Sequence, residues 1–224
     1  MPDRISIFAK VYTFIASDPA QFITVLQEHL LYLVLIPVSL AILVAVPLGI
    51  LATRYKWIEK IALGVTSMLQ TIPSLALLAL MIVMGLGIGY KPAITALFLY
   101  SLLPILRNTF IGIRNVDPAL KEAATGMGMT NMQRLRMVEL PLAFSVIMAG
   151  IRTATVTCIG TGTLAAYVGA GGLGVFIVRG LQLFRNYMLI AGAVPAAVMA
   201  LTADFLLGKL EYALIPRGLK NDNQ

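Results

Sequence analysis

Few side chains in this sequence have the chemistry of a catalytic or metal site. The chain has one histidine, His29, and one cysteine, Cys158, far apart in the sequence. A metal site or a nucleophilic triad needs several such groups held together. The sequence G-x-x-x-x-G-K-[ST], whose loop holds the phosphates of ATP, is absent. We therefore expect no catalytic, metal-binding or cofactor-binding residue in this chain.

A glycine-rich stretch, GAGGLG at residues 169–174, matches the dinucleotide-binding pattern G-x-G-x-x-G. That pattern works only between a strand and a helix. Here no strand is predicted before it, and it lies between two apolar blocks, so we treat the match as false. The glycines instead favour a re-entrant or sharply folded connection that runs to about residue 186.

The composition is that of an integral membrane protein. Apolar residues make up 59% of the chain, charged residues 12%, and the mean hydropathy is +0.89. The net charge of +7 would also suit a nucleic-acid-binding protein. However, the basic residues lie in short segments between apolar blocks, where they mark the cytoplasmic side of a membrane. We expect a lipid environment and no nucleic-acid partner.

Apolar blocks of sufficient length predict five membrane spans, since a helix needs roughly 20 apolar residues to cross a bilayer. The expected spans are residues 30–52, 61–84, 93–106, 142–168 and 187–207, and the third helix should continue to about residue 114. The fold class is therefore an all-α polytopic membrane protein. Its expected divisions are an N-terminal segment at 1–29, a transmembrane domain at 30–208 and a cytoplasmic tail at 209–224.

The N-terminal segment has an amphipathic pattern. Ile5, Phe8, Tyr12 and Ile15 follow a spacing of three and four residues, which places them on one face of a helix. Such a helix either lies flat on the membrane surface or packs this face against other helices of the protein. The sequence leaves both interpretations open.

The basic residues also predict the orientation of the chain. The positive-inside rule favours an N-terminus outside the cell and a C-terminus inside. The basic residues then expected inside are Arg54, Lys56, Lys60, Arg107, Arg114, Lys121, Arg134, Arg136, Lys209, Arg217 and Lys220. Those expected outside are Arg4, Lys10, Lys91, Arg179 and Arg185.

Polar residues inside the spans mark a candidate translocation pathway. The second span is broken by the sequence QTIPS at residues 70–74. In lipid, the carbonyl that a proline frees persists only where protein or water covers it, so the break lines a pathway or forms a packed kink. Threonines on one face of the fourth span suit a pathway or close helix packing. The candidate residues are Gln70, Thr71, Ser74, Tyr100, Arg152, Thr157 and Thr161.

Arg152 lies about 15 Å past Pro141 at 1.5 Å per residue, close to the middle of the fourth span. An arginine at that depth costs roughly 2.5–3.5 kcal/mol on an insertion scale, so it should face protein or water and have a partner. Asp204 lies at similar depth if the fifth helix continues to about residue 215. An ion pair of Arg152 with Asp204 is the leading interpretation, and a role in the pathway or gate is the alternative.

Residues 117–141 form a polar insert between the third and fourth spans. Asp117 can cap a first helix, with Pro118 in its first turn. Gly126 and Gly128 can end that helix, because glycine adopts the left-handed conformation without strain. The insert therefore begins with a short helix and a glycine turn.

A second helix should follow in the same insert. Thr130 and Gln133 have the spacing of a capping box, and Pro141 is expected to end the helix. The pair is then helix, glycine turn, helix, lying outside the bilayer. These signals alone would also fit an ordinary cytoplasmic loop.

The insert resembles the EAA motif of bacterial ABC importer permeases, E-A-A-x3-G-x9-I-x-L-P. The matching residues are Glu122, Ala123, Ala124, Gly128, Val138, Leu140 and Pro141, with only Val138 departing from the motif. The strings QTIPSLALLAL, LYSLLPILRNTFIGI, IMAGIRTATV and VGAGGLG resemble the permease subunits of osmoprotectant uptake systems of the OpuC type. Together the resemblance covers roughly residues 30–218.

The resemblance implies the MetI-like type I importer fold in a bacterial cytoplasmic membrane. The chain would be a permease that moves glycine betaine, carnitine or choline into the cell by alternating access, and would not itself be an enzyme. Its partners would be two ATPase subunits that bind ATP and Mg²⁺, a second permease, identical or homologous, and an extracytoplasmic substrate-binding protein.

The resemblance also assigns a role to the insert. Glu122, Ala123, Ala124 and Gly128 would sit in a groove of the ATPase, where small side chains permit close approach and the glutamate meets a basic partner. The two short helices would act as a rigid lever on the third and fourth spans.

Other functions fit the sequence less well. An importer permease for another small polar solute or amino acid is the first alternative. A stand-alone channel or ion-coupled carrier should show an intramembrane acidic relay or an inverted repeat, and the sequence has neither. A membrane enzyme would need paired catalytic groups at depth, which one histidine and one cysteine do not provide.

Overall fold

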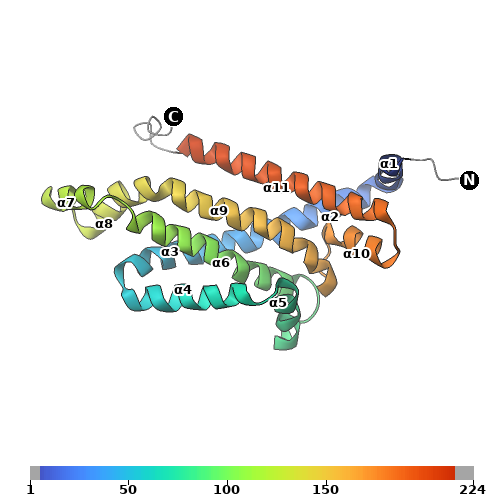
Figure 1. Ribbon diagram of the computed structural model, residues 1–224, viewed down its shortest axis with the longest axis horizontal. Coiled ribbons are helices and arrows are strands. Elements are labelled where there is room, and N and C mark those ends of the chain that lie inside the picture. The colour runs from blue at the N-terminus through green and yellow to red at the C-terminus, as the bar shows by residue number, and fades with distance from the viewer. Residues whose placement is uncertain (1–5, 215–224) are drawn as a thin grey trace, which may run out of the picture.

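The computed structural model describes residues 6–214, and all regular elements in that range are helices. Within this range four helices are long and apolar enough to cross a membrane, and they lie roughly side by side (Figure 1). They are Pro19–Arg54, α6 (Tyr90–Arg114), Asn131–Val168 and α11 (Asn186–Leu214). The all-α polytopic fold class is confirmed.

Two of the long helices contain several elements. The first consists of α2 (Pro19–Leu30), the π-helical turn η1 (Leu31–Leu35) and α3 (Ile36–Arg54). The helix Asn131–Val168 consists of α8 (Asn131–Arg134), the π-helical turn η3 (Leu135–Glu139), α9 (Leu140–Gly162) and the 3₁₀ turn η4 (Thr163–Val168). The remaining elements are α1 (Ile7–Ser17), α4 (Lys56–Thr71), α5 (Ser74–Met81), η2 (Ile82–Leu86), α7 (Pro118–Gly126) and α10 (Gly174–Gln182).

The predicted break in the second span is a sharp bend. α4 and the helical segment Ser74–Leu86 meet at 101°, with Pro73 between them. The pair counts as a fifth span only if both arms belong to one crossing of the membrane. A chain that bends this far exposes backbone carbonyls, which need donors from elsewhere.

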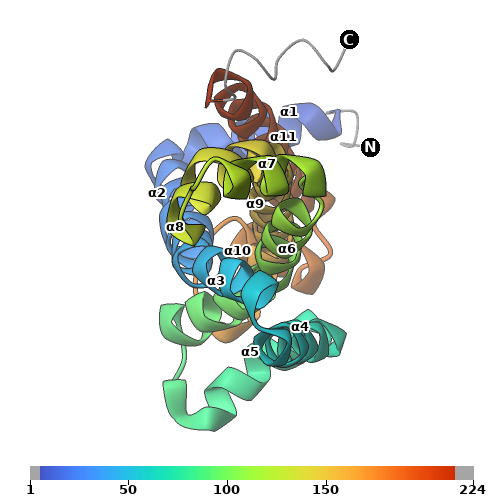
Figure 2. The ribbon, with the colours of Figure 1, turned by 90° about the vertical axis from the view of Figure 1, so that its left-hand side faces the viewer.

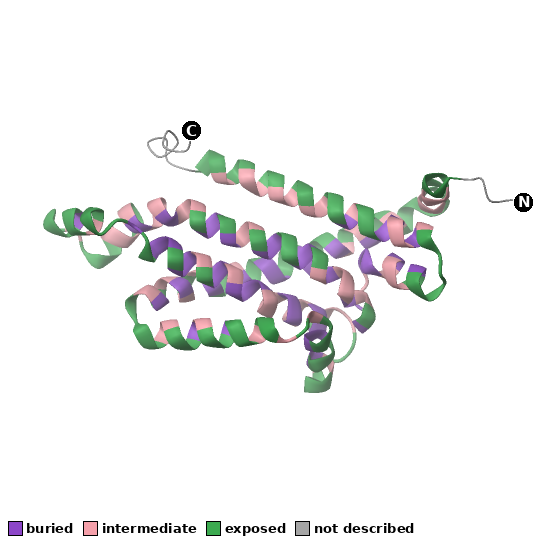
Figure 3. Cartoon of the chain, in the orientation of Figure 1, coloured by how far each residue is buried: buried purple, intermediate pink, exposed green. Residues whose placement is uncertain are grey.

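α3, α6 and α9 form the centre of the bundle, with α11 packed on α9 and the α4–α5 pair on the opposite side (Figures 1 and 2). Small residues let the central helices approach closely. A Cβ atom on Gly49 would come within 2.8 Å of Thr109 Cβ, and one on Gly150 within 2.7 Å of Pro104 O. Burial agrees with this arrangement. Among the four long helices, the central helix α6 is the most buried and the outer helix α11 is the least buried (Figure 3).

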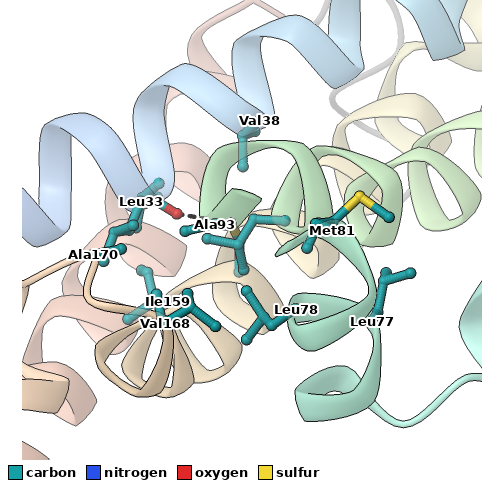
Figure 4. Close-up of a cluster of buried hydrophobic side chains, with 14 residues drawn as sticks. Leu33, Val38, Leu77, Leu78, Met81, Ala93, Ile159, Val168 and Ala170 are labelled. Carbon is teal, nitrogen blue, oxygen red and sulfur yellow. Dashed lines mark hydrogen bonds between the residues drawn. The ribbon is translucent and has the colours of Figure 1, made fainter. Parts of the chain in front are cut away.

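A buried apolar cluster lies where α5 meets the core (Figure 4). Leu77 and Leu78 of α5 pack there with Leu33 of the first helix and Ile159 of α9. All four side chains are at most 2% exposed. The bend after α4 therefore turns α5 into the protein.

Polar side chains satisfy backbone carbonyls that the prolines and helix ends leave free. Pro37 has no N–H to donate to Leu33 O, and the Cys158 thiol donates to that oxygen instead (3.1 Å). Pro104 likewise cannot donate to Tyr100 O, which accepts from Gln70 Nε2 (3.1 Å).

Two further carbonyls are satisfied in the same way. At the bend, the Tyr100 hydroxyl donates to Ile72 O. Where α9 ends, the N–H of Thr163 turns to Gly160 O, and Ile159 O accepts from His29 Nε2 (3.1 Å). The only histidine and the only cysteine of the chain thus both donate hydrogen bonds to backbone carbonyl groups.

The structure corrects two helix boundaries expected from the sequence. The helix of the first span begins at Pro19, well before the apolar block at residue 30. Pro141 does not end the helix before it, because helical structure runs unbroken from Asn131 to Val168. The π turn η3 precedes that proline, and Leu140 N donates five residues back to Leu135 O, so the wider turn accommodates the proline ring.

The amphipathic face of α1 is also different from the expected one. Phe8 and Tyr12 are 74% and 75% exposed. Phe14 makes the packing contact instead, with its ring 5.4 Å from that of Phe176. The packing interpretation therefore fails for Phe8 and Tyr12, while Ile5 and the tail beyond residue 214 lie outside the described residues.

The hydrogen bond from the Cys158 thiol to Leu33 O predicts an unusual order of stabilities among variants of Cys158. Cys158→Ala leaves Leu33 O buried without a donor, which costs about 1–3 kcal/mol. Cys158→Ser keeps a donor, so the serine variant should unfold at a higher temperature than the alanine variant. Thermal unfolding of the purified permease complex in detergent measures this. An alanine variant at least as stable as the serine variant would show that Cys158 acts only as a small apolar residue.

Candidate functional site

α7 and α8 form a helical hairpin at one end of the molecule, beyond the ends of the core helices (Figure 1). The expected caps are present. Asp117 accepts from Ala119 N (2.8 Å), and Thr130 and Gln133 form a reciprocal capping box. The hairpin therefore holds its own ends through short-range bonds, as a water-exposed element must.

Gly128 closes α7 in the way expected, and Gly126 does not. Gly128 has φ +81°, its N–H donates to Thr125 O (3.0 Å), and Met129 N donates to Ala124 O (3.1 Å). This pair of bonds is a Schellman motif, which needs a left-handed residue at that position. Gly126 is the last helical residue of α7, where other residue types fit equally well.

The residues of the EAA match divide into two structural groups. Glu122, Ala123 and Gly128 are exposed on the hairpin, whereas Ala124 is only 1% exposed and packs inside this chain. Ala124 is therefore unavailable for contact with a partner, contrary to expectation.

The second half of the match joins the hairpin to the core. Leu140 packs against the buried cluster of Ile113, Val116, Ala143 and Ile147. Val138 and Pro141 are half-buried nearby on the same helix. These positions fix how α8 continues into α9, and they do not form an outer surface.

The hairpin presents an apolar surface that the sequence patterns did not single out. Its large exposed side chains are Leu120 (46%), Met127 (70%), Met132 (56%) and Met137 (64%). Exposed apolar groups on a water-facing element mark a docking site, and methionine adapts its shape to a partner. The insert contains four methionines, of which these three are exposed, and that number in so polar a segment was the signal in the sequence.

A depression of about 310 Å³ lies next to this surface. It is lined by Lys121, Glu122, Thr125, Gly126 and Arg134. Lys121 Nζ also donates to Ile113 O (3.0 Å) and Arg114 O (3.1 Å), which are carbonyls at the end of α6. α7 is thereby fastened to α6 by a charged cap.

A second polar cluster lies between α9 and α11. Arg152 contacts both oxygens of Asp204 (2.9 and 3.0 Å) and also Glu211 (3.1 Å). α11 continues to Leu214, as the depth argument requires. Glu211 was missed, although it follows Asp204 by two helical turns on the same face and therefore reaches the same guanidinium.

The candidate pathway residues fall into two separate groups. Arg152 and Thr157 line a groove of about 430 Å³ with Asp204. Gln70, Thr71 and Ser74 lie at the α4–α5 bend, and Tyr100 of α6 is hydrogen-bonded to that bend. Thr161 lies on α9 and donates to Thr157 O (2.9 Å). The hydrogen bonds give Gln70 and Tyr100 a structural role at the bend.

Solved structures show the same fold. Inward-facing structures of the MetNI methionine ABC transporter match with a TM-score of 0.74 at 22% identity, covering 90% of this chain and 99% of that chain. An amino acid ABC transporter structure matches with a TM-score of 0.72 at 23% identity, covering 91% and 98%. These likenesses show that the chain has the fold of those transporter chains.

Sequence relatives are much closer. The carnitine transport permease protein OpuCB of Listeria monocytogenes is 50% identical over 94% of this chain and 95% of its own length. The glycine betaine/carnitine/choline permease protein OpuCB of Bacillus subtilis (strain 168) is 46% identical, over 94% and 96%. The osmoprotectant import permease protein OsmW of Salmonella typhimurium is 47% identical, over 91% and 96%.

The family model described as the binding-protein-dependent transport system inner membrane component matches residues 45–217, which include the bent pair, the hairpin and the Arg152 cluster. This chain belongs to that family of ABC importer permeases.

Proposed function

We propose that this chain is the permease subunit of an importer for compatible solutes of the glycine betaine, carnitine and choline class. The relatives at about half identity over nearly their whole length carry names from that class. The observation that carries the proposal is the exposed hairpin, which combines the EAA match with an apolar docking surface.

The hairpin is the site where a separate ATPase would dock. Glu122 and the exposed methionines offer an acidic group beside apolar contacts, next to the depression between α7 and α8. ATP and Mg²⁺ would bind to that ATPase, since this chain has no phosphate-binding loop. The permease itself would then perform no hydrolysis.

The remaining partners follow from the same function. A second permease, identical or homologous, would complete the pathway, and an extracytoplasmic binding protein would deliver the solute. If the hairpin docks an ATPase, the α7–α8 end would face the cytoplasm, and the N-terminus would lie outside and the C-terminus inside, as the positive-inside rule favours. Selection of the solute then belongs mainly to the binding protein.

The assembly can be tested by co-purification from the native membrane. The tagged permease should bring down an ATP-hydrolysing subunit whose activity rises when the binding protein carries glycine betaine, carnitine or choline. Proline and unrelated amines serve as controls in a binding assay on the same protein. A permease that conducts solute alone in liposomes would instead identify a channel or carrier.

Gly128 offers a test with a matched control two residues away. Gly128→Ala forces a side chain into a left-handed conformation, at a cost of about 1–2 kcal/mol, while Gly126→Ala replaces a helical glycine. A Cβ meets no atom within 4 Å at either site, so conformation alone separates the two. Solute uptake and ATPase co-purification should fall in Gly128→Ala and persist in Gly126→Ala. Gly128→Asp also adds a negative charge to the exposed turn, and it should abolish both.

If Gly128→Asp inserts into the membrane and supports uptake at the level of the wild type, the hairpin does not act as the coupling element. Protease protection of the tagged termini confirms that each variant keeps its insertion and orientation.

Arg152 has two carboxylate partners, Asp204 and Glu211, so we expect either one to pair with it when the other is removed. Asp204→Asn and Glu211→Gln should each leave Arg152 with one charged partner and change stability little. The double variant leaves the arginine unpaired at a cost of roughly 2.5–3.5 kcal/mol, and folded permease in the membrane should fall. The measurement is the yield and the melting temperature of the complex. A single variant that lowers uptake without lowering stability would favour the gate interpretation.

A further inference from the structure

Glu139 is a buried carboxylate between the hairpin and the core. It lies at the end of η3, within the EAA match but at a position for which the motif requires no particular residue. Its side chain is 1% exposed. A carboxylate so deeply enclosed must be paired, because an unpaired buried charge is strongly unfavourable.

Two arginines from different elements provide that pairing. Arg54 Nη2, from the last residue of α3, contacts Glu139 Oε2. Arg134 Nε, from α8, contacts Glu139 Oε1 (3.0 Å). Each carboxylate oxygen therefore binds a different guanidinium.

The chain of contacts continues into α7. Arg134 Nη1 donates to Thr125 Oγ1 (3.1 Å), and that hydroxyl donates to Lys121 O (2.8 Å). Polar bonds thus run without interruption from α7 through α8 and Glu139 to the end of α3. Residues far apart in sequence meet here, since Arg54 precedes Glu139 by the whole of α4, α5 and α6.

From this geometry we infer that Glu139 is a positioning residue that transmits movement of the α7–α8 hairpin to the first long helix through Arg54. The inference rests on the proposed function, because it concerns how ATPase movement would reach the pathway. α7 already reaches α6 through Lys121, and α8 continues into α9. The Arg54–Glu139 contact provides the ion pair that joins this hairpin network to the first long helix.

The burial of the Glu139 side chain determines how strong this link is. Breaking a buried pair leaves an uncompensated charge, whereas exposed pairs contribute little. Arg114 and Glu59 form such an exposed pair nearby (3.0 Å), with side chains 63% and 29% exposed. The two pairs therefore provide a test and its matched control at the same end of the molecule.

The experiment uses the complete transporter with its binding protein, reconstituted in liposomes. Phosphate release measures ATP hydrolysis, and labelled glycine betaine, carnitine and choline measure uptake. In Glu139→Gln the ATPase should remain bound and active, while ATP hydrolysed per solute transported rises by at least about tenfold. Glu59→Gln should keep the ratio of the wild type.

A second variant separates transmission from folding. Arg54→Gln leaves Glu139 paired with Arg134, so the hairpin keeps its internal contacts and only the link to α3 is lost. It should show the same rise in the ratio, and the Arg54→Gln/Glu139→Gln double variant should show no further rise. Arg54→Lys, which can keep one charged contact, should restore part of the coupling.

The inference is overturned if Arg54→Gln assembles and transports with the wild-type ratio, whatever Glu139→Gln does. Loss of the ATPase from Arg54→Gln would also overturn it, because the contact would then serve docking alone. Failure of the proposed function looks different, since the wild-type chain would then co-purify with no ATPase and import none of the three solutes.

Discussion

The need to satisfy every backbone polar group inside a bilayer governs this structure. Water is absent from the hydrocarbon, so each carbonyl that a proline or a helix end frees must find a donor within the protein. Cys158, Gln70, Tyr100 and His29 supply those donors. Because every donor comes from a different helix, each bond also fixes how two helices lie. A bend or helix end that leaves a carbonyl free is therefore also a place where two helices are linked by a hydrogen bond.

The hairpin outside the bilayer obeys a different rule. Water can satisfy its backbone, so its shape depends on short-range caps and on one left-handed glycine, Gly128. Its apolar groups then remain exposed to a partner, as Met127, Met132 and Met137 are. The bundle and the hairpin therefore differ sharply in the interactions that hold their shape.

Local signals in the sequence were sufficient for the parts of the fold that local interactions determine. The capping box at Thr130, the stop at Gly128 and the bend at Pro73 all lie where the sequence predicts them. The predictions were wrong where contacts between residues far apart in the sequence determine the structure. No local pattern shows that Ala124 turns inward or that Phe14 packs instead of Phe8, since both depend on which neighbour lies beside the helix.

The charged contacts of Glu139 fix the direction of the hairpin relative to the core. An apolar contact allows two helices to slide, because dispersion has no preferred direction. A carboxylate that binds one guanidinium on each oxygen fixes direction as well as distance. Glu139 binds α3 through Arg54 and α8 through Arg134 in this way. A buried ion pair adds little net stability, and its value here is the geometry that it imposes.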